Sequence, residues 1–119
     1  YTLSLRDALP IWGPQYILVK RGEHGSMLFS HSSTLLVHAF PVEEVKDPTG
    51  AGDSFAGGFM GSLAAETRIT ERSIWRAMVY GSVIASFGVE AFSLDRLRTL
   101  TREELEGRVA DFQRMIGAR

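Results

Sequence analysis

Cysteine is absent from this 119-residue sequence. Disulfides, thiolate zinc sites and cysteine nucleophiles are therefore excluded, and a reducing compartment suits the sequence, so we expect a cytoplasmic protein. An excess of charge is also lacking, because 13 basic residues face 14 acidic ones for a formal net charge of −1. This balance predicts neither nucleic acid nor an acidic membrane surface as a partner. No apolar run approaches the roughly 20 residues that span a bilayer.

The composition that remains is typical of one modest globular domain, with 45% hydrophobic and 23% charged residues. Residues 1–11, YTLSLRDALPI, stand apart because they resemble a translated sequencing adapter, from which Arg6 departs. We interpret residues 1–11 as a non-native leader and residues 12–119 as the protein proper. The alternative is a natural helix or strand whose context is missing.

Short apolar runs between tight turns fill the first third of the sequence. Residues 16–19 form a continuous apolar run, which is typical of a strand buried on both faces. A turn with two glycines follows at residues 21–25, and two further strands are expected over residues 27–29 and 35–38. This part of the chain is therefore predicted to be rich in β-structure.

Helical periodicity replaces this pattern after Gly52. Three large apolar residues then recur every four positions, at Phe55, Phe59 and Leu63. A second helix is expected from about residue 71 to 87, and a third opens with a capping box at residues 101–104. Strands followed by a glycine-rich loop and helices predict an α/β layered domain, or part of one.

The first of these helices carries three glycines, each of which costs about 1 kcal/mol relative to alanine in a helix interior. They are Gly57, Gly58 and Gly61. Glycines at this density indicate close backbone packing or the approach of a ligand, and simple contact between the helix and the sheet explains them equally well.

The segment DPTGAGDSF at residues 47–55 joins the two patterns. The free N–H groups of a helix's first turn and the positive end of its dipole form an anion site. Gly50, Ala51 and Gly52 leave their backbone open to an anionic group, and Asp53 can take a proton from a nearby hydroxyl. Phosphoryl transfer uses both features, because charge spreads over the transferred oxygens and the acceptor needs a base. A glycine turn with an aspartate cap is also common in α/β proteins, so a purely structural role stays open on these residues alone.

This nine-residue loop resembles the C-terminal signature of the ribokinase-like, or pfkB, carbohydrate kinases. The resemblance covers roughly residues 16–95: residues 19–26 are similar to the family's Lys-x-Gly-x-x-Gly turn, and residues 82–86 to its small-residue helix near the adenine. It implies that residues 12–119 form the C-terminal, ATP-binding part of a ribokinase-like three-layer α/β/α fold. The implied activity is ATP-dependent phosphorylation of a sugar or nucleoside hydroxyl.

The resemblance also implies roles for single residues of the loop. Asp53 is the base that deprotonates the acceptor, and the amides of Gly50, Ala51 and Gly52 form the anion hole. Asp47 and the Thr49 carbonyl are similar to ligands of a monovalent-cation site, which implies K⁺. ATP and Mg²⁺ are the implied cofactors, and the magnesium ligands are expected upstream of this sequence.

Further residues are expected along the nucleotide. They are Lys20, Gly22, Gly25, Ser82 and Ala85. An ordinary β-turn explains the first three equally well. The implied partner is a small sugar or nucleoside, bound mostly through an upstream half that also mediates a homodimer. These 119 residues alone are therefore expected to fold poorly and to lack kinase activity.

Other functions fit the sequence less well. A Walker-type phosphate loop ends in Gly-Lys-Ser/Thr, and no lysine follows Lys46. A Gly-Asp-Ser type serine hydrolase needs a histidine after Ser54, whereas all three histidines precede it. Their seven-residue spacing runs across predicted turns, so we expect no metal site there. A non-catalytic nucleotide-binding relative stays open, although retention of Asp53 argues against it.

Overall fold

The computed structural model describes residues 13–117, so the interpretation of residues 1–11 lies outside the described part of the chain. Three strands come first: β1 (Tyr16–Lys20), β2 (Ser26–Ser30) and β3 (Thr34–Val37), with the short 3-10 turn η2 (Gly22–His24) between β1 and β2. Four helices follow: α1 (Ala51–Ala64), α2 (Glu71–Val89), α3 (Asp95–Thr99) and α4 (Arg102–Met115). The three predicted strands and three predicted helices are confirmed. The five-residue α3 was not expected.

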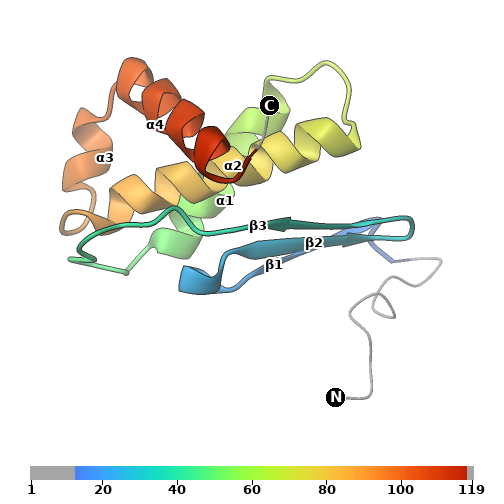
Figure 1. Ribbon diagram of the computed structural model, residues 1–119, viewed down its shortest axis with the longest axis horizontal. Coiled ribbons are helices and arrows are strands. Elements are labelled where there is room, and N and C mark those ends of the chain that lie inside the picture. The colour runs from blue at the N-terminus through green and yellow to red at the C-terminus, as the bar shows by residue number, and fades with distance from the viewer. Residues whose placement is uncertain (1–12, 118–119) are drawn as a thin grey trace.

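The strands form an antiparallel sheet in the order β1-β2-β3 (Figure 1). Its register aligns Leu18 with Leu28 and Leu28 with Leu35. Because side chains alternate across a strand, these three leucines share one face, and Leu28 and Leu35 belong to the core or pack against it. The expected burial of residues 16–19 on both faces is not found within the described residues. There β1 is an edge strand whose central residues are only half-buried.

The core lies between this sheet and α2. Figure 1 shows α1 and α2 running side by side along the sheet, with α3 and α4 against α2. The helix α2 supplies most of the fully buried apolar side chains, among them Met78, Val79 and Val83. Val109 and Phe112 of α4 complete the core, and the ring of Phe112 meets that of Phe40 edge-on at 5.5 Å.

Two helices begin with capping boxes. At the start of α4 the Thr101 hydroxyl accepts a hydrogen bond from the Glu104 N–H, and the Glu104 carboxylate accepts one from the Thr101 N–H, as the sequence predicts. Thr70 and Ser73 exchange the equivalent pair of bonds at the start of α2. Among the described residues, none of the helices combines the length and the apolar character that a membrane span needs.

Glycine allows α1 and α2 to pack closely. A Cβ atom added at Gly58 would lie 2.9 Å from Ile84 Cγ1 and 3.1 Å from Gly81 Cα, and one added at Gly81 would lie 2.9 Å from the Phe55 carbonyl oxygen. Close backbone packing, one of the explanations for the glycines, is therefore confirmed for Gly58. Gly57 and Gly61 have no such neighbour within 4 Å among the described residues.

We predict that Gly58→Ala lowers the free energy of unfolding by about 1–3 kcal/mol, because the new methyl group must displace backbone of α2. Gly107→Ala is the matched control: Gly107 lies inside α4 with open space around it, and the substitution should stabilise by up to about 1 kcal/mol through helix propensity alone. Chemical denaturation measures both changes. Equal stabilities for the two variants would contradict the close helix crossing.

Candidate active site

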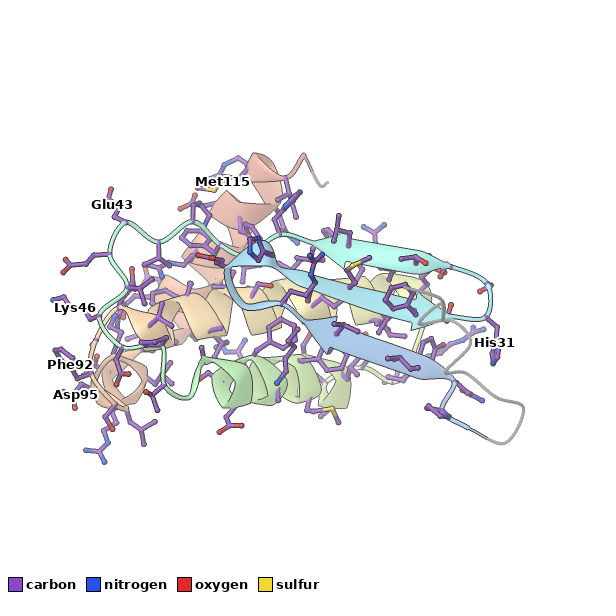
Figure 2. The ribbon with its side chains drawn as sticks, turned by 90° about the horizontal axis from the view of Figure 1, so that it is seen from below. His31, Glu43, Lys46, Phe92, Asp95 and Met115 are labelled. Atoms are coloured by element: carbon purple, nitrogen blue, oxygen red, sulfur yellow. The ribbon has the colours of Figure 1, made fainter. Side chains whose placement is uncertain are left out.

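The loop that precedes α1 is attached to the C-terminal end of α2. The N–H groups of Lys46 and Asp47 both donate to the Val89 carbonyl oxygen, at 2.8 and 3.2 Å. Figure 2 accordingly shows Lys46 at the same end of the molecule as Phe92 and Asp95, with His31 at the opposite end. The loop therefore starts from a fixed point on the longest helix.

Asp47 fastens the loop a second time. Its Oδ2 accepts a hydrogen bond from the Ser93 N–H at 3.1 Å, and its Oδ1 accepts one from the Thr49 N–H at 3.0 Å. The pKa of Asp47 is lowered, first by the bond from Ser93 and then by the bonds from Thr49. Ser93 takes a positive φ of 52°, which is uncommon for a residue other than glycine. No pattern in the sequence predicts that Ser93 takes part in this contact.

Gly50 begins α1 in the left-handed conformation, with φ of 81° and without a side-chain cap. The Ala51 N–H donates to the Pro48 carbonyl oxygen at 3.2 Å. The N–H groups of Gly50, Gly52 and Asp53 have no acceptor among the described residues. Three open donors at the positive end of a helix dipole suit an anion. Ala51 is thus the least available of the three amides expected from the sequence, while the Asp53 N–H is an additional donor.

A cleft of about 780 Å³ opens on one side of this helix start. All five residues expected along the nucleotide line it, namely Lys20, Gly22, Gly25, Ser82 and Ala85. Its apolar walls were not anticipated from the sequence; they include Phe40, Val42, Val45, Phe55 and Val89. These residues come from three separate segments, so no local pattern marks them. A largely apolar cleft with a few polar groups is typical of a site for a small molecule.

Lys20 links the cleft to the loop. Its Nζ donates to the Gly52 carbonyl oxygen at 3.0 Å. The ammonium group therefore lies within one residue of the open amides at the start of α1, where it adds positive charge to the anion site.

Two of the cleft residues have clear structural roles. Gly25 has φ of 89°, and a Cβ atom there would lie 2.3 Å from the Val37 carbonyl oxygen, so the turn requires glycine whether or not a ligand binds. The Ser82 hydroxyl donates to the Met78 carbonyl oxygen at 2.9 Å within its own helix. The turn alone therefore explains the glycine at position 25, and this explanation does not exclude a nucleotide bound beside it.

Asp53 lies on another side of the helix. Ala51, Gly52 and Phe55 line the cleft and Asp53 does not, which follows from the 3.6-residue period of α1. Its side chain is exposed and has no hydrogen-bond partner among the described residues. The carboxylate and the cleft thus flank the same group of open amides.

The described residues contain no group of three or more His, Asp or Glu side chains that could hold a metal ion. The three histidines are not brought together: His31 lies at the tip of the β2–β3 hairpin, whereas His24 lines the cleft. Asp47 and Thr49 are adjacent, but both Asp47 oxygens already accept backbone N–H groups.

Known proteins resemble the chain over most of its length. The family model described as pfkB family carbohydrate kinase matches residues 4–96. A nucleoside kinase of Thermoplasma acidophilum is 37% identical over 106 residues, which cover 86% of this chain and 32% of that protein. A structure of the Burkholderia thailandensis nucleoside kinase in complex with inosine aligns with a TM-score of 0.71 and 26% identity, over 82% of this chain and 30% of that one.

A more distant neighbour shares the fold. It is a double mutant of the Vibrio cholerae fructokinase, in a form bound to fructose, ADP and potassium ion, with a TM-score of 0.65 and 20% identity over 82% of this chain and 30% of that one. The chain spans between 19% and 32% of the length of the curated relatives that it matches first.

The antiparallel sheet, the glycine loop and the helix that starts from it place the chain among α/β proteins of the ribokinase type. The chain belongs to the pfkB family of carbohydrate kinases.

We predict that Asp47→Ala lowers the melting temperature at neutral pH, because two backbone N–H groups lose their acceptor. Since the pKa of Asp47 is lowered in the folded protein, its stabilising effect is complete above the ordinary value of 3.8 and disappears as the pH falls through the lower folded pKa. Glu43→Ala, an exposed carboxylate of the same segment, is the control and should change little. Melting curves between neutral and acidic pH measure the difference. A decrease that is the same at every pH would contradict an ionised Asp47 clamp.

Proposed function

We propose that the protein to which this chain belongs transfers the terminal phosphoryl group of ATP to a hydroxyl of a sugar or nucleoside. The chain contributes the nucleotide cleft, the anion hole at the start of α1 and the base. A single observation carries this proposal: the cleft and the Asp53 carboxylate lie on different sides of the same open amides.

Phosphoryl transfer needs such an arrangement, because the attacking and leaving oxygens lie roughly in line on opposite sides of the transferred group. ATP in the cleft brings its terminal phosphate to the N–H groups of Gly50, Gly52 and Asp53. Lys20 lies on the cleft side of this point and offsets the phosphate charge. The acceptor then approaches from the Asp53 side, where the carboxylate takes the hydroxyl proton as the new bond forms.

The apolar walls of the cleft suit the base of a nucleotide. Phe40, Val42 and Val89 offer flat or branched apolar surface next to the backbone of the β1–β2 turn. Nucleoside kinases are among the relatives, with inosine bound in one of them. A nucleoside is therefore a suitable acceptor as well as a sugar.

Mg²⁺ would accompany ATP, with ligands expected upstream of this sequence, as the family resemblance implies. A K⁺ ion beside the loop stays a proposal: the Thr49 carbonyl and a lone pair of an Asp47 oxygen are the available ligands. When bound, such an ion supplies positive charge next to the anion hole. Poor folding and inactivity of these residues on their own also stay a prediction.

We predict that Asp53→Asn in the full-length protein lowers kcat by about 10²–10⁴-fold, because a positioned base is lost. ATP affinity should be retained, since the carboxylate does not line the cleft. Steady-state kinetics and calorimetric titration with ATP measure the two quantities.

Asp95→Asn is the matched control, because Asp95 is likewise an exposed aspartate in the first turn of a helix. It should leave both quantities unchanged. If Asp53→Asn kept more than about a tenth of the wild-type kcat, the assignment of Asp53 as base would be wrong.

A further inference from the structure

Arg108 of α4 makes an unusually complete set of contacts with the end of α2. Its Nη1 and Nη2 donate to the two carboxylate oxygens of Glu90, at 2.9 and 3.1 Å, and Nη1 also donates to the Ser86 hydroxyl at 3.0 Å. The Arg108 side chain is only 20% exposed. Bidentate pairing of this kind fixes orientation as well as charge.

Two aromatic rings hold the same guanidinium group. Its central carbon lies 3.6 Å from the ring centroid of Phe87 and 4.9 Å from that of Phe40. A second guanidinium, that of Arg96, lies 4.8 Å from the Phe87 ring. Stacking on aromatic faces adds to the hydrogen bonds, and lysine cannot reproduce both at once.

These contacts lead directly to the proposed nucleotide site. Ser86 and Phe40 both line the 780 Å³ cleft, whereas Arg108 itself does not. The Ser86 hydroxyl donates to the Val83 carbonyl oxygen at 2.6 Å and accepts from Arg108, so its orientation is fixed from both sides. Arg108 thereby fixes the positions of two residues that line the cleft, although it does not line the cleft itself.

The same contacts lead to the catalytic loop. Glu90 directly follows Val89, whose carbonyl oxygen accepts the N–H groups of Lys46 and Asp47. Three residues further on, the Ser93 N–H binds the Asp47 carboxylate. Arg108 therefore holds in place the short segment at the end of α2 to which the start of the loop is hydrogen-bonded.

Stability alone does not account for this arrangement. Removing two charges from water costs free energy that their attraction only partly offsets, so a largely buried ion pair adds little net stability compared with apolar residues. Its characteristic contribution is a fixed geometry. The residues fixed here are those that line the cleft and suspend the loop.

We propose that Arg108 is a positioning residue for ATP. Through its contacts with Ser86 and Phe40 it fixes the wall of the cleft, and through Glu90 it fixes the position of the catalytic loop. This inference rests on the proposed function. It assigns a role in the site to α4, which contributes no residue to the lining of the cleft.

The test uses the full-length protein and two substitutions, Arg108→Met and Arg108→Lys. Methionine keeps an apolar stem over the rings and removes the charge, while lysine keeps the charge and loses the bidentate geometry. The measured quantities are the Kd for ATP by calorimetry, kcat, the KM for ATP and for the acceptor, and the melting temperature. All kinetic data are taken well below the lowest melting temperature of the set.

Arg108→Met should raise the Kd and KM for ATP by about tenfold or more and lower kcat, because small displacements around a reacting centre have large effects. The KM for the acceptor should stay within about twofold, since no contact of Arg108 reaches the Asp53 side. Arg108→Lys should lie between wild type and Arg108→Met. Arg114→Met, which removes an exposed ion pair with Asp111 on the same helix, is the matched control and should change none of these constants.

Glu90→Gln adds a second measure. Because Glu90 and Arg108 act through one contact, the double variant should be no worse than the more impaired single variant, whereas independent roles would give additive effects. Folded Arg108 variants that melt at a lower temperature but bind ATP within about twofold of wild type would overturn the inference and leave the proposed function intact. Failure of the wild-type protein to bind ATP would overturn both.

Discussion

The structure depends on the attachment of the loop before α1 to the C-terminal end of α2. The Val89 carbonyl at the end of α2 accepts the N–H groups of Lys46 and Asp47, and the Asp47 carboxylate accepts those of Thr49 and Ser93. These four hydrogen bonds set where the chain enters α1. The left-handed Gly50, the open amides and Asp53 all follow within six residues of that point. Close packing at Gly58 and Gly81 then fixes the direction in which α1 leaves the loop.

This constraint explains how so short a chain can hold several functional groups in a defined relation. A helix start offers open N–H donors in any protein, and by itself it is no evidence of a reaction. Here the same donors lie between an apolar cleft that contains Lys20 and an exposed carboxylate. In the proposed function, this arrangement lets the two substrates approach the transferred phosphoryl group from opposite sides, as an in-line reaction requires. Arg108 adds a contribution from α4, because it stabilises the end of α2 to which the loop is hydrogen-bonded.

Much of this was predictable from the sequence, for local reasons. The apolar runs gave the three strands, the four-residue spacing of Phe55, Phe59 and Leu63 gave α1, and the capping box at Thr101 gave the start of α4. The glycine loop indicated a candidate site because all nine residues of its signature are contiguous in the sequence. The cleft walls, the Ser93 contact and the Arg108 cluster were not predictable, because each joins segments that are far apart in the sequence: Ser93 lies 46 positions from Asp47, and Arg108 lies 18 positions from Glu90. The edge position of β1 was also not predicted, because an apolar run indicates that a strand is buried but does not show which strands lie beside it.

The central claim is that the start of α1 separates nucleotide from acceptor. A crystal structure of the full-length protein with a non-hydrolysable ATP analogue and a bound nucleoside or sugar tests it most directly. The account predicts the terminal phosphate at the N–H groups of Gly50, Gly52 and Asp53, with the acceptor hydroxyl within about 3.2 Å of the Asp53 carboxylate on the side away from the cleft. A terminal phosphate bound away from these amides, or an acceptor hydroxyl on the cleft side and beyond the reach of Asp53, would contradict it.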